Sequence, residues 1–264
     1  MSVTSLRPTP APALQEMEQL VEEGYFVREN LLPPDLLEGL RAAVDEVAAQ
    51  ERKAGASDGN GLFTGQFIRH LFGKHPAFVS LIDYAPTLSV ARAVLGPAVQ
   101  VRLSARISPP GRANQQTPWH VHVRSTPDPL PPFYSFPHTL DVLTYLDDLN
   151  EANGLLCVVP GTHRQTTTAP PHDDVADRPE QVCVSVRAGG GVFSHGHLWH
   201  RARPSGLDGT VRRLLALTYF PAWFKPFAED GPPPADDLLD ALRREGSREI
   251  RELLGETSGA SAAM

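Results

Sequence analysis

The chain has 264 residues, a hydrophobic content of 41% and a formal net charge of −7. This length and apolar content suit a single all-β domain with additions, and the acidic balance without a basic stripe argues against a nucleic-acid partner. No run approaches the roughly eighteen apolar residues of a membrane span, and residues 1–14 lack the apolar segment of a signal peptide. We therefore expect a cytoplasmic protein without a membrane partner, and the composition leaves its oligomeric state open.

The first third of the chain is predicted to be helical. Residues 1–11 are expected to be disordered, and residues 12–23 carry apolar side chains at helical spacing before Gly24. A second helix is predicted to begin at Pro33-Pro34-Asp35 and to continue to about Lys53. A third is expected within Pro86–Leu95, where Gly96 and Pro97 end it.

From residue 99 the pattern changes to short apolar or alternating segments separated by Gly and Pro. Such spacing is typical of a sandwich or jelly roll, so we expect a mainly β fold with N-terminal helices. The predicted strands cover residues 99–107, 140–146, 155–159, 182–186, 192–193 and 213–220. We expect one domain over residues 12–225, followed by a partly helical extension over 226–264 whose end is disordered.

One further segment, Thr117–Arg124, contains two histidines two residues apart, His120 and His122. If this segment is a strand, both imidazoles leave the same face, and together they form half of a metal site. A third ligand must come from elsewhere, and the segment from His195 to His200 is the best candidate. By spacing alone, His195 and His197 compete there with His200.

Four segments together resemble the phytanoyl-CoA dioxygenase family. They are His120-Val121-His122, the run from Leu146 to Arg164 containing Asn153-Gly154 and Val158-Val159-Pro160-Gly161-Thr162-His163-Arg164, then Leu198-Trp199-His200, and finally Arg212-Arg213. The resemblance covers about Glu23 to Phe224. It implies a double-stranded β-helix (a cupin-like jelly roll) that uses Fe(II) and 2-oxoglutarate.

By position in that family, His120 and His200 are the implied metal ligands, and His122 stands where the family usually has an aspartate. The exchange removes an anionic donor, although three imidazoles still suit a first-row metal. Three interpretations stay open: a metal centre of three histidines, a centre that uses a nearby carboxylate such as Asp128 or Asp141, or a member without hydroxylase activity.

The keto acid needs a cation for its carboxylate, and a buried arginine meets this need through paired hydrogen bonds. In the family this arginine lies on the strand after the distal histidine, which favours Arg212 over the neighbouring Arg213. Only one of the two can face the interior, because successive side chains of a strand point to opposite faces. Thr144 is a second, weaker candidate for the same keto acid.

The reaction implied by the resemblance is oxidative decarboxylation of 2-oxoglutarate, coupled to oxidation of a C–H bond of a small organic molecule by dioxygen. The outcome could be hydroxylation or a related oxidation, and the sequence does not identify the substrate. Two alternatives remain: a jelly roll that only binds a small ligand, and a three-histidine dioxygenase that does not use 2-oxoglutarate.

Overall fold

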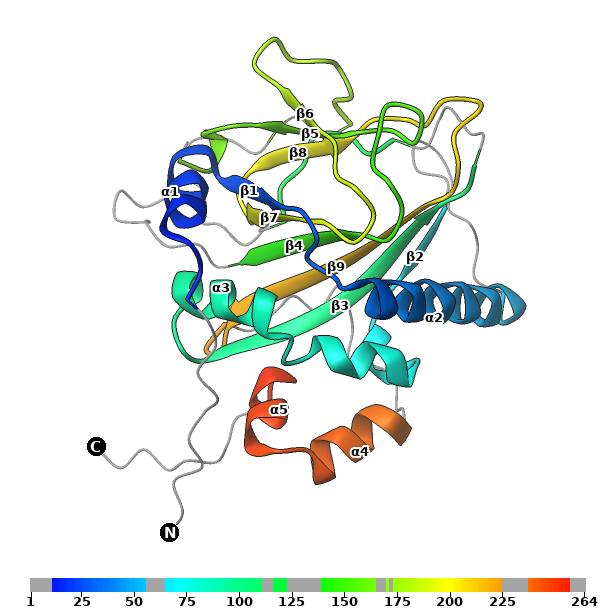
Figure 1. Ribbon diagram of the computed structural model, residues 1–264, viewed down its shortest axis with the longest axis vertical. Helices are drawn as coiled ribbons and strands as arrows, with labels where there is room; N and C mark the ends of the chain where they lie inside the picture. The colour runs from blue at the N-terminus through cyan, green and yellow to red at the C-terminus, as the bar shows by residue number, and fades with distance from the viewer. Residues whose placement is uncertain are drawn as a thin grey trace.

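A computed structural model describes the chain in six stretches and one single residue. These are 11–55, 65–110, 116–122, 139–164, 170, 173–224 and 237–256. The fold is a jelly roll of two antiparallel sheets with helices on the outer face of the larger sheet (Figure 1). This confirms the predicted fold class.

The larger sheet has six strands in the order β1-β7-β4-β9-β3-β2. Its strands are β1 (Tyr25–Arg28), β2 (Gln66–Ile68), β3 (Val99–Ser108), β4 (Leu140–Tyr145), β7 (Gly191–His195) and β9 (Arg212–Pro221). The smaller sheet has the order β6-β5-β8 and contains β5 (Leu156–Val159), β6 (Val182–Val184) and β8 (Trp199–Ala202). The strands predicted after residue 139 are present, within a few residues at their ends.

The α-helices that follow β1 lie on the side of the larger sheet that faces away from the smaller one, whereas the first helix lies beside the edge strand β1 (Figure 1). The α-helices are α1 (Leu14–Glu23), α2 (Pro34–Lys53), α3 (Ala85–Leu95), α4 (Asp237–Glu245) and α5 (Arg248–Leu253), with short 3-10 helices at Leu71–Gly73, Pro76–Leu81 and Thr162–Arg164. Gly24 ends α1 with φ +88°, a conformation that glycine adopts without strain. The predicted partly helical extension contains two helices, α4 and α5, which are separated by Gly246 and by Ser247, whose side chain accepts a hydrogen bond from the Ile250 N–H at the start of α5. The side chains of Leu239 and Leu253 are buried in the same core as the helices before the jelly roll.

Strand alternation sorts the central side chains into two layers. The odd-numbered residues of β3 and β9 pack against the helices, and the even-numbered ones face the space between the sheets. On β4 the parity is reversed, so that Leu140 and Val142 face the helices while Leu143 and Tyr145 face the smaller sheet. The position of each polar residue along these strands therefore decides whether it reaches the interior.

The expected strand at Thr117–Arg124 is shorter than predicted. Only His120 makes a ladder pair, an isolated antiparallel bridge with His200, and residues 123–138 lie outside the described part. Pro118 has no N–H to donate to a ladder, and the N–H of Trp119 is bonded to the carbonyl of Asp174 instead. The disorder predicted for residues 1–11 falls, apart from residue 11, outside the described residues, and so does the end of the C-terminal extension after residue 256.

Candidate metal centre

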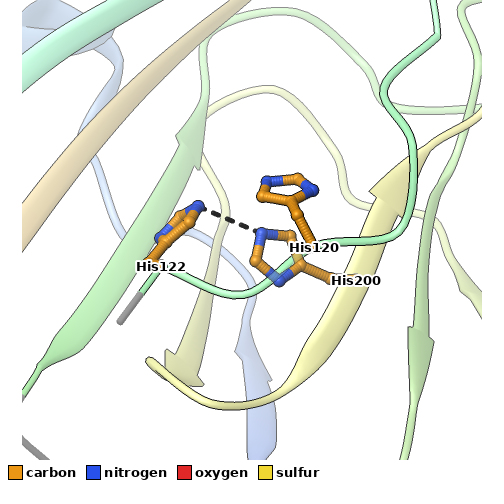
Figure 2. A group of neighbouring side chains, drawn as sticks. All are labelled: His120, His122 and His200. Atoms are coloured by element: carbon orange, nitrogen blue, oxygen red, sulfur yellow. Dashed lines mark hydrogen bonds between the residues drawn. The ribbon is translucent and has the colours of Figure 1, made fainter. Parts of the chain in front are cut away.

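Three histidines from two distant segments converge between the sheets (Figure 2). His120 and His200 bond each other through their backbones, with N···O distances of 3.0 and 3.1 Å, and the N–H of His122 bonds the carbonyl of Gly196 at 2.9 Å. The backbone N–H groups of His120 and His122 are thus both bonded to the segment from Gly196 to His200, so residues two apart still present their rings to one point. One ring nitrogen of each histidine lies within 4.8 Å of those of the other two.

The outward nitrogens of two rings are held by backbone carbonyls. Nδ1 of His120 lies 2.9 Å from the carbonyl of Pro118, and Nδ1 of His200 lies 2.9 Å from the carbonyl of Leu198. A carbonyl can only accept, so each of these Nδ1 atoms carries the proton, and Nε2 of the neutral ring keeps its lone pair. Burial, with the neighbouring imidazoles, lowers the pKa of His120 well below its ordinary value and that of His200 to about 3. Both rings are therefore neutral at neutral pH and can act as ligands.

The third ring is held by a carboxylate. Nδ1 of His122 lies 2.8 Å from Oδ2 of Asp141, whose side chain is 1% exposed. Thr218 donates a hydrogen bond to the other oxygen of Asp141 at 2.7 Å. Burial raises the pKa of Asp141, but the charge and hydrogen bond of His122 and the hydrogen bond of Thr218 together bring that pKa below its ordinary value. A buried anion therefore lies directly behind the ring of His122.

The inward nitrogens leave space for one cation. Nε2 of His122 and Nε2 of His200 are 3.1 Å apart. Two nitrogens bound at about 2.1 Å and at a right angle to one metal ion would be about 3.0 Å apart. With Nδ1 of both rings facing an acceptor, the facing lone pairs need a proton or a metal ion between them. The donor set and this spacing therefore fit a divalent first-row metal.

The two carboxylates considered as alternative metal ligands, Asp141 and Asp128, have different outcomes. Asp141 faces the Nδ1 side of His122, away from the point where the three rings meet, so its position suits it to orient that ring and not to take the place of the ring. Asp128 lies outside the described residues. Sequence reasoning raised Asp141 as a ligand but missed its place behind His122; the parity of β4, which puts Asp141 on the face of Leu143, was the available signal.

His195 and His197 do not join the centre. Nδ1 of His195 accepts a hydrogen bond from the backbone N–H of His197 at 3.0 Å, and their rings are 5.7 Å apart. The ring of His195 also lies 5.1 Å from that of His163, whose Nε2 is bonded to the carbonyl of Val21. Among the described residues, only the group of His120, His122 and His200 brings three potential ligand atoms together.

Arg212 and Arg213 point to opposite faces of β9, as strand alternation requires. Arg212 lines the interior, where its Nη1 donates to the carbonyls of Asn153, at 2.7 Å, and Gly154, and its Nη2 to Ser108 Oγ at 3.3 Å. A Cβ on Gly154 would lie 2.7 Å from Nη1 of Arg212, so the Asn-Gly turn needs glycine to approach the guanidinium. Arg213 faces away and forms ion pairs with Asp45 and Asp147 at 2.8 Å each.

Thr144 is not brought to the interior. The parity of β4 places it with Leu140 and Val142, on the helix-covered face, and it is absent from the described residues that line the cavity. The predicted contact of Thr144 with a keto acid is therefore not supported by its position. The hydroxyl groups that do line the cavity belong to Thr117, Thr139, Tyr145, Thr218 and Ser104.

The cavity between the sheets has a volume of about 500 Å³ and includes all three histidines and Arg212 in its lining. Arg102 and Arg106 of β3, and Arg69 just after β2, also line it. Sequence reasoning missed these three arginines. The alternation of β3, which puts Arg102, Ser104 and Arg106 on one face, could have found two of them.

Comparisons with known proteins place the chain among recognised relatives. The profile of the family described as phytanoyl-CoA dioxygenase (PhyH) matches residues 20–209. Ectoine dioxygenases of Bordetella parapertussis and Bordetella bronchiseptica are 26% identical over 162 residues, which are 59% of this chain and 51% of each relative. The chain thus matches about half the length of these curated relatives.

Solved structures share the fold. The non-haem, α-ketoglutarate-dependent carbocyclase SnoK from nogalamycin biosynthesis has a TM-score of 0.63 and 22% identity, covering 86% of this chain and 95% of its own. HygX from Streptomyces hygroscopicus, with nickel and 2-oxoglutarate bound, has a TM-score of 0.63 and 16% identity, covering 82% of this chain and 90% of its own.

Proposed function

The chain belongs to the phytanoyl-CoA dioxygenase family, and on this premise we propose that it is a non-haem iron, 2-oxoglutarate-dependent oxygenase that oxidises a C–H bond of a small organic molecule. The observation that carries the proposal is the arrangement of His120, His122 and His200, whose Nδ1 atoms face acceptors while a ring nitrogen of each faces the other two. The relatives named dioxygenases and the keto-acid-dependent structures of the same fold support it.

His120, His122 and His200 would hold Fe(II), which together with 2-oxoglutarate supplies the oxidising power for dioxygen chemistry when bound. A facial set of three protein ligands leaves three positions for the keto acid and dioxygen. In this chain the anionic charge that an aspartate ligand would provide lies one imidazole further out, on Asp141. A carboxylate behind a ligating histidine fixes the ring and makes its metal-bound nitrogen a stronger donor.

Arg212 would bind the distal carboxylate of the keto acid. Its guanidinium is buried, and the contacts that hold it are neutral oxygen atoms of Asn153, Gly154 and Ser108. A buried cation held by neutral groups is stabilised when an anion binds beside it. The carbonyl groups of Asn153 and Gly154 would therefore hold the guanidinium of Arg212 in position before the keto acid binds.

The test is turnover of 2-oxoglutarate by the full chain reconstituted with Fe(II) in air. We expect succinate to form and dioxygen to be consumed, with both lost in His200→Ala. Dioxygen consumption without dependence on 2-oxoglutarate would favour a three-histidine dioxygenase of another kind. Binding of 2-oxoglutarate without any succinate would favour the ligand-binding jelly roll.

A further inference from the structure

The two cysteines of the chain, Cys157 and Cys183, face each other on the smaller sheet. They are direct register partners on the antiparallel strands β5 and β6, and β6 is an edge strand of this sheet, with β5 between it and β8 (Figure 1). Both are free thiols, and their sulfur atoms are 2.7 Å apart. Neither belongs to the described residues that line the cavity of the three histidines, so the proposed oxygenase function does not account for the pair.

The backbone geometry of this pair suits a disulfide bond. Directly opposed residues of two antiparallel strands have Cα atoms about 4.5–5.5 Å apart, which lies inside the range of about 4.4–6.8 Å that disulfides span. A covalent S–S bond is about 2.05 Å long, so the two sulfurs have to approach by only about 0.7 Å. Strands β5 and β6 can therefore be joined covalently while they keep their register.

The two thiols differ in access and in environment. The side chain of Cys157 is 0% exposed and packs with Trp119 and Val159, whereas Cys183 is partly exposed. Burial, followed by the hydrogen bond with Cys183, raises the pKa of Cys157 to about 12. The side-chain amide of Gln181 directs its Nε2 at the sulfur of Cys183, at 3.9 Å. Because a cysteine attacks as an accessible thiolate, Cys183 is the one that meets a reagent from solvent first.

We propose that Cys157 and Cys183 are a redox-active dithiol that closes to a cross-strand disulfide by exchange with a small-molecule disulfide of the glutathione type. Cys183 gives up its proton and attacks one sulfur of the reagent, whose S–S bond breaks; one thiol leaves, and a mixed disulfide remains on Cys183. Cys157 then attacks the sulfur of Cys183 and expels the second thiol, which takes up the proton of Cys157. The protein loses two electrons and two protons, and the reagent gains both.

The bond would fasten a segment that supports the candidate metal centre. This segment precedes Cys183, and its carbonyl groups at Asp174 and Ala176 accept the backbone N–H and the indole N–H of Trp119 at 2.7 and 2.8 Å. Trp119 immediately precedes His120. A cross-link between positions 26 residues apart stabilises the folded chain chiefly by restricting the unfolded one. We expect the oxidised protein to melt at a temperature higher by about 5 °C or more.

The experiment equilibrates the full chain with mixtures of reduced and oxidised glutathione, in the presence of a chelator so that no metal ion oxidises the thiols. After acid quenching and alkylation with N-ethylmaleimide, intact mass spectrometry counts the free thiols. We expect one state with both thiols alkylated and one with neither, and each should convert into the other when the glutathione ratio is reversed. Because the chain contains two cysteines, the oxidised monomer can hold only this disulfide.

Single variants test the order of the two attacks. Cys157→Ser should accumulate a glutathione adduct on Cys183, because no second thiol is present to displace it. Cys183→Ser should form about tenfold less adduct in the folded state, since Cys157 is buried, and should form it readily in denaturant. Cys157→Ser is also the matched control for stability: its melting temperature should change by less than about 1 °C on oxidation, while that of the unmodified chain rises.

Several results would overturn the inference. Thiols that stay reduced in millimolar oxidised glutathione would show that the pair does not exchange. A bond that excess reduced glutathione cannot open in the folded protein would be a permanent structural one, and disulfide-linked dimers in place of the internal bond would mean that the two sulfurs of one chain do not join. Equal adduct on the two single variants would contradict the order of attack. An unchanged melting temperature of the oxidised chain would contradict the fastening of the segment.

Discussion

In the part of the chain that the structure describes, two groups of three histidines can be compared, and one of them has the geometry of a metal centre. In the group of His120, His122 and His200, each Nδ1 faces an acceptor and the remaining nitrogens meet. In the group of His163, His195 and His197, a ring nitrogen of His195 is used by a backbone N–H and Nε2 of His163 by a carbonyl. Both groups contain three imidazoles, so the difference lies in which ring nitrogens are already hydrogen-bonded to the surrounding protein.

The largest expected effect tests this difference directly. His200→Ala should lower the affinity for a divalent metal by about 1,000-fold or more, because it removes one ligand of three and opens the buried end of the site. His195→Ala should leave that affinity within about threefold. Metal content after dialysis and titration of Zn²⁺ into the metal-free protein measure both. Comparable losses in the two variants would mean that the two groups are not distinct.

Arg212 and Arg213 offer a second comparison, because they are adjacent in the sequence but point to opposite faces of β9. Arg212→Gln should raise the concentration of 2-oxoglutarate needed for half-maximal turnover by about 100-fold, since losing one partner of a buried charge pair costs about 2–5 kcal/mol. The metal content should not change. Arg213→Gln should instead lower the melting temperature, because Arg213 joins Asp45 of α2 to Asp147. An equal effect of both variants on the keto acid would contradict the assignment.

A smaller effect tests how Asp141 acts on the ring of His122. Asp141→Asn should weaken metal binding by about 10- to 100-fold, as is usual when the partner of a ligating histidine is lost. Optical spectra of the Co²⁺-substituted protein should shift as well, because the donor strength of His122 falls. In a His122→Asp background the same change should have little further effect, since the imidazole that connects Asp141 to the metal is gone. Asp208→Asn, at an exposed position, is the control.

The smallest expected effect concerns how the free energy of unfolding depends on pH, and it involves His163 of the second histidine group. Burial lowers the pKa of His163 below its ordinary value, although the hydrogen bond with Val21 opposes the shift. The unfolded chain therefore takes up this proton at a higher pH than the folded chain does. The free energy of unfolding should fall as the pH drops below about 6.5. His163→Gln should reduce that fall between about pH 8 and about pH 5.5, as measured by urea unfolding. An unchanged slope would show that His163 titrates alike in both states.

Local sequence was enough to predict much of the scaffold. Pro34 at the start of α2 and Gly24 after α1 fix helix ends through their own backbone preferences. The alternation of β3 and β9 fixes which side chains share a face, and this parity correctly separated Arg212 from Arg213. Among the described residues, no helix is both long enough and apolar enough to cross a bilayer.

The centre itself depended on contacts between distant segments. The spacing of His120 and His122 predicted a shared direction, but the bridge between His120 and His200 selected the third histidine over His195 and His197. The parity of β4, fixed when it pairs with β7 and β9, put Asp141 behind His122 and turned Thr144 toward the helices. Local periodicity gives the order of side chains along a strand. Only the packing of the two sheets decides which of its faces is the interior, because that choice minimises exposed apolar surface over the whole chain.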